Sequence, residues 1–549
     1  MKNYIISFLT LLMLTIGGCT EYLDYNEEDF YAEEDIFQNF DRTKSFVDGL
    51  YGNLSGGFNE VGGAMRASAS DDAEEANSLE NIQTINDGRW SATQTLDAQW
   101  QAMYRGIRSA NRLLKNHDVS SLDDRRYADG YFELIEQYNL FDDQARFLRA
   151  YFYFELMRRY GSVPLLNGSI LTLENVNEVQ SSSFEEVKNF IVDECDAIID
   201  SLPVNYDGIT GGPHKGRATR GAAMALKART LLYAASPLHG SLQSEWAEAA
   251  EAAYALIDSG FYALEGNYAD VVNNSASTEL IMGRRVPSTR WFEASNFPVG
   301  YEGANPGTCP TQNLVSTYEM ANGMDIDEAG SGYDPQNPYE NRDPRLHQTV
   351  IVNNSIWKGR PVEVWPNGAD GPPTERATET GYYLKKYLVE NVSLDPDNLT
   401  TANHLWVFFR YGEVILNFAE AMNEAYGANA DPQGYGMTAV DALNMIRNRA
   451  GLPDYTGIMT KSAVRQEIRD ERRVELAFEN HRFWDVRRWM IGDQTTDIMG
   501  MEVTQNLDGT FSYNKVSLES RTWDDRMYLY PIPQSELFKN PGLQQNPGW

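Results

Sequence analysis

Residues 244–260, SEWAEAAEAAYALIDSG, show the pattern that decides the fold. Gly260, the last residue of this stretch, is a typical signal for the end of a helix. The apolar side chains recur every three or four residues, which places them on one stripe of an α-helix: Trp246, Ala249, Ala250, Ala253, Leu256 and Ile257. The stretch is therefore predicted to be an amphipathic helix that buries one face against a neighbour.

The same pattern occurs in pairs of segments along the chain. Each pair joins a large helix rich in small residues to a second, often Ala-rich helix: 141–161 with 183–203, 217–237 with 244–260, and 405–427 with 439–453. Ser183 and Glu186 have the spacing of a capping box at the start of one of them. Further helices are expected near 43–54 and 96–116. The sequence thus predicts a mainly α fold, a tetratricopeptide-like scaffold in which each unit buries its face on the next.

Between about residues 261 and 403 the composition changes. Gly, Pro, Asn and aromatic residues dominate, with short strand-like runs such as HQTVIVNN (347–354) and GYYLKKYLV (381–389). Such a long irregular region inside a helical chain is usually functional. We predict one domain over 19–549, with a scaffold at about 40–260 and 405–549 and a large irregular insertion at about 261–403.

The first 18 residues have the features of a secretory signal. Lys2 precedes an apolar run, Ile5 to Ile16, that is too short to span a bilayer. The small pair Gly17-Gly18 then stands directly before Cys19, which resembles the bacterial lipobox. In proteins of that kind the signal is cut before the cysteine, and the cysteine carries acyl chains that anchor it to the membrane. The alternative is a plain signal peptide with a chance cysteine at position 19.

The net charge limits the classes of partner. Removal of residues 1–18 takes away Lys2 and no acid, which leaves 45 Lys and Arg against 79 Asp and Glu, a net charge of −34. Nucleic-acid binding depends on basic residues that neutralise phosphates, so nucleic acid is not expected as a partner. Neutral ligands suit this chain better than polyanions.

The remaining cysteines give no disulfide framework. Cys195 lies in the apolar helical pattern FIVDECDAII and is predicted to be a core thiol. Cys309 lies in the Gly- and Pro-containing loop GANPGTCPTQ. A Cys195–Cys309 bridge stays open at this point.

No motif for catalysis, metal or cofactor binding stands out. The six histidines are scattered, without the spacing of zinc ligands. Acidic clusters such as Asp71, Asp72, Glu74 and Glu75 could hold a glycosidase pair or a calcium ion, but solvated loops explain them more simply. We therefore expect neither catalysis nor a cofactor nor a metal site.

Residues 467–489, EIRDERRVELAFENHRFWDVRRW, carry the densest charge pattern. Glutamates recur every four residues: Glu467, Glu471, Glu475 and Glu479. Like charges at that spacing destabilise an isolated helix. We predict that arginines from elsewhere, such as Arg487 or Arg488, pair with them at a packed helix junction.

The same segment resembles the SusD/RagB family of outer-membrane nutrient-binding lipoproteins. Further matching stretches are FLRAYFYFELMRRYGSVPLL (147–166), ATRGAAMALKARTLLYAASP (218–237), FRYGEVILNFAEAMNEA (409–425) and IRNRAGLP (446–453). The C-terminal YLYPIPQSELFKNPGLQQNPGW (528–549) resembles the family's end signature, with Trp549 where Tyr is usual.

The resemblance implies a fold of four tetratricopeptide-like helix pairs with an irregular insertion. It also implies a non-enzymatic function at the cell surface. Family members are lipid-anchored in the outer membrane, capture glycans or, in a few cases, peptides, and form a lid on a SusC-like TonB-dependent transporter. The alternatives are a peptide-capturing protein on the same scaffold and a surface glycosidase.

Sugar rings offer C–H faces to aromatic side chains and hydroxyl pairs to planar polar groups. The aromatic candidates outside clear helices are Trp90, Trp291, Phe297, Tyr301, Trp357 and Trp365. The polar candidates in loops are Asp71, Asp72 and Arg376, and Cys309 is added from its loop. Trp100, Trp484 and Trp489 are expected in the core. The resemblance does not transfer site residues, because its motifs lie on the scaffold.

Overall fold

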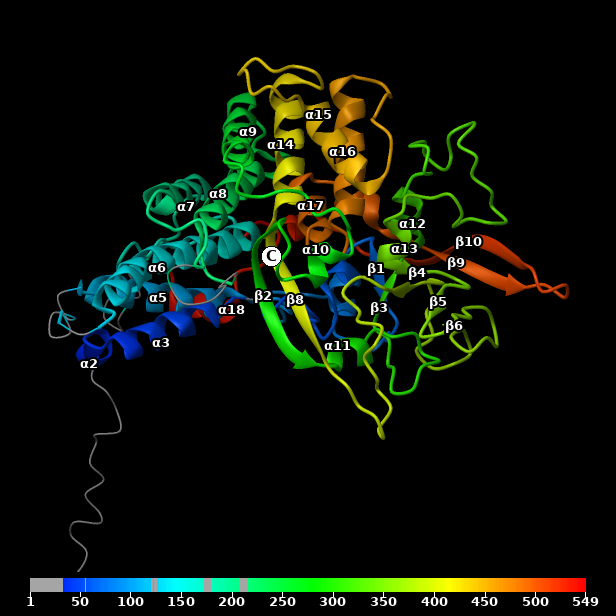
Figure 1. The fold of residues 1–549 in the computed structure, drawn as a ribbon, viewed down its shortest axis with the longest axis horizontal. Coiled ribbons are helices and arrows are strands. Elements are labelled where there is room, and N and C mark those ends of the chain that lie inside the picture. The colour runs from blue at the N-terminus through cyan, green and yellow to red at the C-terminus, as the bar shows by residue number, and fades with distance from the viewer. Residues whose placement is uncertain are drawn as a thin grey trace, which may run out of the picture.

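The computed structural model describes residues 33–549, apart from 55, 120–121, 123–125, 128, 172–178, 208 and 210–215. The predicted signal peptide and Cys19 lie outside the described residues. A helical array occupies one side of the molecule and a region of loops and short strands occupies the other (Figure 1). None of the described helices has the length and apolar character needed to cross a membrane.

The array is built from long helices that pack on their neighbours in sequence order. Its members are α2 (Glu33–Phe37), α3 (Phe40–Tyr51), α5 (Trp100–Asn116), α6 (Tyr131–Tyr160), α7 (Phe184–Ile199), α8 (Arg220–Ala235), α9 (Gln243–Asp258), α14 (Tyr411–Tyr426), α15 (Ala439–Ala450) and α16 (Lys461–Glu475). α5 packs on α6, α6 on α7, α7 on α8 and α8 on α9. α9 then packs on α14, which also contacts α15 and α16. The predicted mainly helical, tetratricopeptide-like fold is confirmed.

Local sequence explains where several of these helices begin. The Ser183 hydroxyl accepts from the backbone N–H of Glu186, and the Glu186 carboxylate accepts from the Ser183 backbone, so the predicted capping box is present. Thr438 and Asp441 form the same arrangement at the start of α15. α14 is different because almost every residue in it is buried, from Tyr411 to Ala425. A helix that is buried on all sides belongs at the centre of a packed structure.

A long antiparallel ribbon leads from the array into the irregular region and back. β2 (Leu280–Thr289) pairs with β8 (Ala402–Arg410), and α14 begins at the residue after β8. The other elements of the loop-rich side are short: α4 (Gln83–Asn86), α10 (Asp270–Asn273), α11 (Trp291–Ala294), α12 (Gln312–Thr317), α13 (Leu346–Thr349), β1 (Ala73–Glu75), β3 (Thr308–Pro310), β4 (Val350–Ile351), β5 (Ile356–Trp357), β6 (Arg360–Pro361) and β7 (Tyr383–Leu384). The two strand-like runs of the sequence meet as the antiparallel pair β4–β7.

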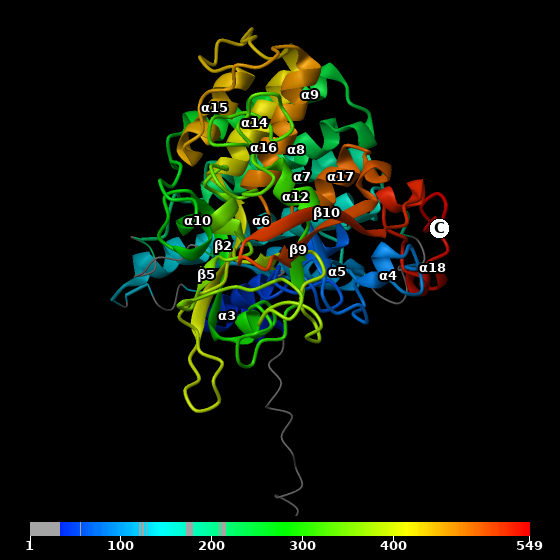
Figure 2. The ribbon, with the colours of Figure 1, turned by 90° about the vertical axis from the view of Figure 1, so that its right-hand side faces the viewer.

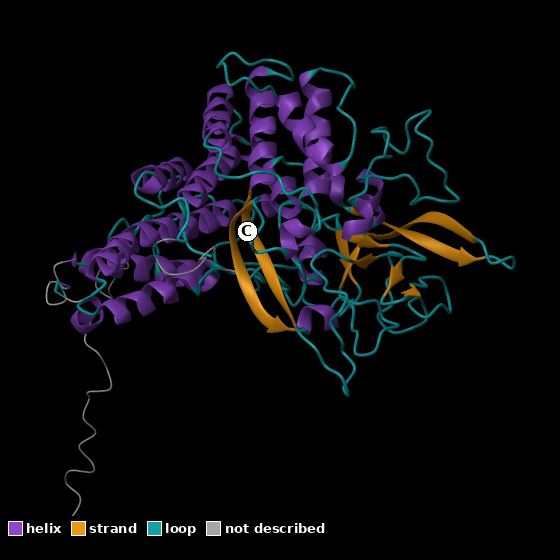
Figure 3. Ribbon diagram, in the orientation of Figure 1, coloured by secondary structure: helices purple, strands orange, loops and turns teal. Residues whose placement is uncertain are grey.

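The C-terminal part adds a feature that the sequence reading overlooked. After α17 (Arg482–Arg488), β9 (Asp497–Gln505) and β10 (Phe511–Ser520) form a hairpin that projects beside the loop-rich region (Figure 3). The prediction had assigned this stretch to the helical scaffold. In β9, Met499, Met501 and Val503 alternate with small or polar residues, and the Asp508-Gly509 pair in the connecting loop is a turn signal, so the sequence did contain evidence for this hairpin. The chain then returns to the array through α18 (Gln534–Lys539).

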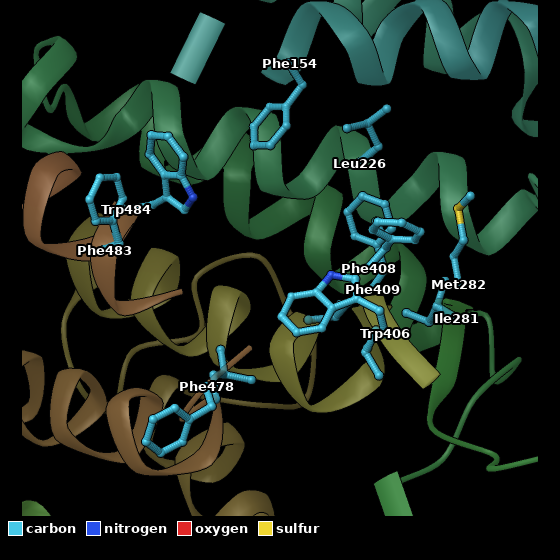
Figure 4. Close-up of a cluster of buried hydrophobic side chains, with 14 of the residues drawn as sticks. Phe154, Leu226, Ile281, Met282, Trp406, Phe408, Phe409, Phe478, Phe483 and Trp484 are labelled. Carbon is cyan, nitrogen blue, oxygen red and sulfur yellow. The ribbon is translucent and has the colours of Figure 1, made fainter. Parts of the chain in front are cut away.

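One hydrophobic core joins the helices to the ribbon. Figure 4 shows Phe154 and Leu226 from the helices beside Ile281 and Met282 from β2 and the aromatic run of β8. Trp484 and Phe483 of α17 lie at another side of this cluster. Cys195 is buried with a free thiol, as predicted, and Cys309 is also free, so the two cysteines form no bridge.

The glutamates of α16 and the following turn form a buried network that we call the charged junction: Glu279, Arg345, Arg410, Glu471, Glu475 and Glu479. Arg410 Nη1 donates to Glu279 Oε1 at 2.6 Å and to Glu475 Oε1 at 2.7 Å, and Arg410 Nε donates to Glu479 Oε2 at 2.7 Å. Arg345 Nη1 donates to Glu471 Oε1 at 2.5 Å and to Glu475 Oε2 at 2.9 Å. The predicted pairing at a helix junction is therefore present.

The partners suggested for these glutamates were wrong. Arg488 pairs with Glu420 and Asp485, and Arg487 lies over the ring of Phe483. The chain turns sharply at Phe478 and Asn480, which have positive φ angles of 63° and 66°. α17 therefore leaves α16 in a new direction and carries its arginines to other carboxylates.

Candidate functional site

Three segments that are distant in sequence meet within the loop-rich side, at the buried strands β1 and β3. β1 pairs antiparallel with β3, in a register that sets Glu74 opposite Cys309 and Glu75 opposite Thr308. Beyond the strands, the Ala76 backbone N–H donates to the Gly307 carbonyl at 2.8 Å, and the Gly307 N–H donates to the Ser295 carbonyl at 2.8 Å. These bonds hold the end of β1 next to the segment that follows α11.

The predicted polar residues Asp71 and Asp72 lie at the inner end of this strand and are engaged by the scaffold. Arg482 Nε donates to Asp71 Oδ1 at 2.8 Å, and Arg473 Nε donates to Asp72 Oδ1 at 2.6 Å. Burial opposes ionisation of Asp71, but the charges of Arg473 and Arg482 outweigh it and lower the pKa of this carboxyl. Both side chains are buried, so they fasten β1 to α16 and α17 and have no free face for a ligand.

The outer end of the strand differs from the inner end. Glu74 accepts from Gln83 Nε2 at 2.7 Å and pairs with Arg521 of the segment after β10. Glu75 is only 6% exposed, and its Oε2 has no hydrogen-bond partner among the described residues. A Cβ at Gly307 would lie 2.5 Å from Glu75 Oε1, so only glycine leaves room for this carboxyl.

The electrostatic setting of Glu75 is unusual for a carboxyl near the surface. The pKa of Glu75 is raised to about 8, first by burial and then by the carboxylates of Glu80 and Glu74, while the charge of Arg376 acts in the opposite direction. Burial likewise raises the pKa of Glu74 to about 7. Arg376 is half-buried, so the predicted residue Arg376 stands within electrostatic reach of an acid that still has a free oxygen. Such a carboxyl can donate or accept a hydrogen bond, according to its protonation.

Trp291 is the candidate ring with the most open surface. It is 39% exposed at the start of α11 and rests edge-on against Phe58 and Phe292. Phe58 and Phe292 hold the indole in place, and the exposed part of the ring remains available for contact with a ligand. Tyr301 is half-buried, its hydroxyl donates to the Trp357 carbonyl at 2.7 Å, and Arg360 lies 3.9 Å above its ring centroid. One face of Tyr301 is therefore already covered.

The other predicted rings lie in the core. The prediction that their faces are exposed for stacking against a sugar is therefore wrong. Trp90 is 2% exposed and packs edge-on against Tyr530 and Trp549, at centroid distances of 5.0 and 4.8 Å. The C-terminal segment returns over this loop and covers the ring. Four further candidates are also buried: Phe297, Trp357, Trp365 and Cys309. Trp100, Trp484 and Trp489 are buried as predicted.

We call the remaining candidate residues the rim site: Glu74, Glu75 and Arg376, which interact electrostatically, together with Trp291, the exposed ring of α11. Sequence reasoning noted Glu74 and Glu75 only as part of an acidic run. The sequence could not tell which of four neighbouring acids would find arginine partners. Across the described ranges, no group of three or more His, Cys, Asp and Glu side chains is arranged to hold a metal ion.

Comparisons with known proteins agree along nearly the whole chain. A family model described as the SusD family matches residues 268–549, and one described as "Starch-binding associating with outer membrane" matches residues 21–232. SusD-like protein P2 of Formosa agariphila is 23% identical over 575 residues, which cover 100% of both chains.

Solved structures show the same similarity in three dimensions. A SusD-like protein from Bacteroides fragilis is 28% identical, with a TM-score of 0.78 over 94% of this chain and 99% of its own. A second B. fragilis protein, described as a SusD-like carbohydrate binding protein, is 26% identical, with a TM-score of 0.75 over 93% of this chain and 100% of its own. With a family model that matches more than half of its residues and a fold shared from end to end, the chain belongs to the SusD family.

Proposed function

We propose that this protein captures an oligosaccharide or polysaccharide at the cell surface and passes it to a SusC-like TonB-dependent transporter. The support from relatives is that one similar structure is described as a carbohydrate binding protein and that a matching family is described as starch-binding and outer-membrane-associated. The observations that carry the proposal are the open indole of Trp291 in the insertion and the carboxyl of Glu75 on β1, which is joined to the insertion by its pairing with β3.

The rim site has the chemistry that a sugar requires. The exposed surface of Trp291 offers a flat apolar patch to the C–H face of a pyranose or furanose ring. The half-buried guanidinium of Arg376 offers hydrogen bonds to hydroxyl groups. Glu75 Oε2 is buried without a partner among the described residues, so it would contact a ligand only after a local shift of its surroundings. Binding by shape and a few hydroxyl contacts involves no bond chemistry, so the proposed protein is not an enzyme.

The proposed location is the outer membrane, with Cys19 as the lipidated residue and the scaffold at the cell surface. Two or more acyl chains on one cysteine are sufficient for stable anchoring. The charge of the mature chain favours a neutral glycan, because a polyanion would be repelled on approach. In this proposal one domain serves both tasks: the insertion holds the glycan and the molecule closes on its transporter.

The test is retardation of the lipid-free chain, from Thr20 onward, in affinity gels that contain neutral polysaccharides. We expect one glycan to retard the wild-type protein and Trp291→Ala to weaken this retardation. Phe538→Ala is the matched control, because it removes another exposed aromatic ring, on α18. Retardation by no glycan would overturn the proposal and favour capture of peptides. An equal loss in both variants would remove Trp291 from the site.

A further inference from the structure

α5 carries a basic face on a strongly acidic protein. The chain has 79 acidic against 46 basic residues, yet the 17 residues of α5 contain no acid. Its basic residues are spaced by three, four and three positions and share one side of the helix: Arg105, Arg108, Arg112 and Lys115. The opposite side is buried against the array, so the basic side is turned outward.

Most of this charge is not used inside the protein. Arg105, Arg108 and Lys115 are exposed and form no hydrogen bond or ion pair with any residue that the structure describes. Arg112 pairs with Glu33 at 2.9 Å. That hydrogen bond lowers the pKa of Glu33, and the nearby charges of Lys115 and Arg108 lower it further, which shows the positive potential of the face.

A groove joins the basic face to the C-terminal segment. It has a volume of about 360 Å³ and is lined by residues of both α5 and α18. Figure 2 shows α18 beside the C-terminus at the edge of the molecule. Its lining combines the apolar side chains of Leu166, Leu171 and Leu543 with the basic Arg105, Arg108 and Lys539. Lys539 pairs with Glu536 of the same groove at 2.7 Å, so the unpaired charge comes from α5. Phe538, the residue before Lys539, is 80% exposed. Basic residues among apolar side chains, with an exposed aromatic ring beside them, are typical of contact with a lipid–water interface.

The position of the face relative to the anchor supports the same partner. α2 packs on α5, and Glu33, the first described residue, is held by Arg112. Cys19 lies 14 residues before Glu33, a length of chain that spans at most on the order of 50 Å. An anchor with that reach does not fix how the domain is oriented relative to the membrane. A basic face close to the point where the anchor segment joins the domain would fix that orientation.

We propose that the face formed by Arg105, Arg108, Lys115, Lys539 and Phe538 binds the anionic headgroups of the membrane and orients the domain on the lipid surface. The proposal rests on the proposed anchoring at Cys19. Exposed basic residues gain energy at an anionic surface within about a Debye length, whereas the acids on distant faces of the protein are screened.

The test uses the lipid-free chain and co-sedimentation with vesicles, so that the contact is measured without the anchor. The vesicles contain either phosphatidylglycerol or only phosphatidylcholine, at about 50 mM and about 300 mM NaCl. We expect at least about threefold more bound protein on phosphatidylglycerol at low salt, and loss of the difference at high salt.

Two sets of variants make the test specific to this face. R105Q/R108Q/K115Q, or Phe538→Ser alone, should reduce binding to phosphatidylglycerol. R285Q/R290Q/K515Q removes the same charge from exposed residues of β2, the turn before α11 and β10, and should keep most of the binding. Circular dichroism checks that each variant is folded.

The proposal is overturned if wild-type protein does not distinguish the two lipids, or if both triple variants lose binding equally. Binding of the face to an acidic protein surface in place of lipid would produce the first of these results. Retardation by glycan is measured on R105Q/R108Q/K115Q as well. Loss of vesicle binding with intact retardation separates this inference from the proposed capture of glycan.

Discussion

The charged junction and the rim site are both rich in carboxylates, yet their side chains are satisfied to different degrees. In the junction, Arg410 donates to Glu279, Glu475 and Glu479, and these four groups are buried. Each of the three glutamates has a second cationic partner: Arg449, Arg345 or Lys386. At the rim, Glu75 is nearly as buried but keeps an oxygen without a partner in the described part of the chain. Full pairing satisfies the buried charges of the junction, whereas Glu75 Oε2 lacks a protein partner and is therefore a candidate contact for water or a ligand.

The largest expected effect comes from breaking the junction. Arg410→Ala would remove one cationic partner from each of three buried carboxylates, so we expect a loss of about 3–5 kcal/mol in stability. Arg449, Arg345 and Lys386 remain as their other partners. Urea unfolding followed by circular dichroism measures this loss. Arg465→Gln is the control, because its pair with Glu424 is partly exposed and should contribute less than about 1 kcal/mol. Equal effects of the two variants would show that the junction is not the stabilising network described here.

Trp90→Ala tests whether a buried ring was correctly moved from the site to the core. Its contacts with Tyr530 and Trp549 lie inside the molecule, so we expect a loss of about 3 kcal/mol in stability. Glycan retardation of the folded variant should stay at the wild-type level. A variant that is as stable as wild type but is not retarded by glycan would show that Trp90 belongs to the binding site.

Glu75→Gln should change how stability depends on pH. Burial raises the pKa of Glu75 to about 8, so the folded protein keeps a proton that the unfolded chain releases near pH 4.3. The stability contributed by the protonated carboxyl is complete below the unfolded pKa and is lost as the pH rises through about 8.

Glutamine stays neutral throughout, so the variant should gain on the order of 1–3 kcal/mol relative to wild type between pH 5.5 and 8.5. Unfolding midpoints at the two pH values measure this gain. The exposed Glu302→Gln, on a neighbouring loop, is the control. The same pH-dependent gain in the control would contradict the assignment to Glu75.

Trp291→Ala should have the smallest effect on stability and a selective effect on binding. Its indole is partly exposed, so we expect a loss of less than about 1 kcal/mol in stability. The affinity for glycan should fall by about 1 kcal/mol, roughly fivefold, because one stacking surface is lost. Gel retardation measured across a range of glycan concentrations gives this value. A large loss of stability with unchanged affinity would place Trp291 in the core.

The scaffold could be predicted because its signals are local. Helical spacing, capping residues and small residues predicted the array. The glutamates at 467–479 predicted a helix junction in which they pair with arginines. The hairpin of β9 and β10 was missed because the alternation in β9 is short and β10 is largely polar and exposed or half-buried. Prediction of the site was poorer, because most of the candidate rings proved to be buried.

The sequence by itself determined the helical array, the presence of a large irregular insertion and the resemblance to the family, since these depend on patterns within short segments. Only the tertiary structure decided which of Asp71, Asp72, Glu74 and Glu75 would be paired and which rings would stay open. Arg473 and Arg482 reach Asp71 and Asp72 from about 400 residues further along the chain, and Trp549 covers Trp90 from the C-terminus. Pairing and burial depend on such distant contacts, and a residue's own neighbours in sequence do not encode them.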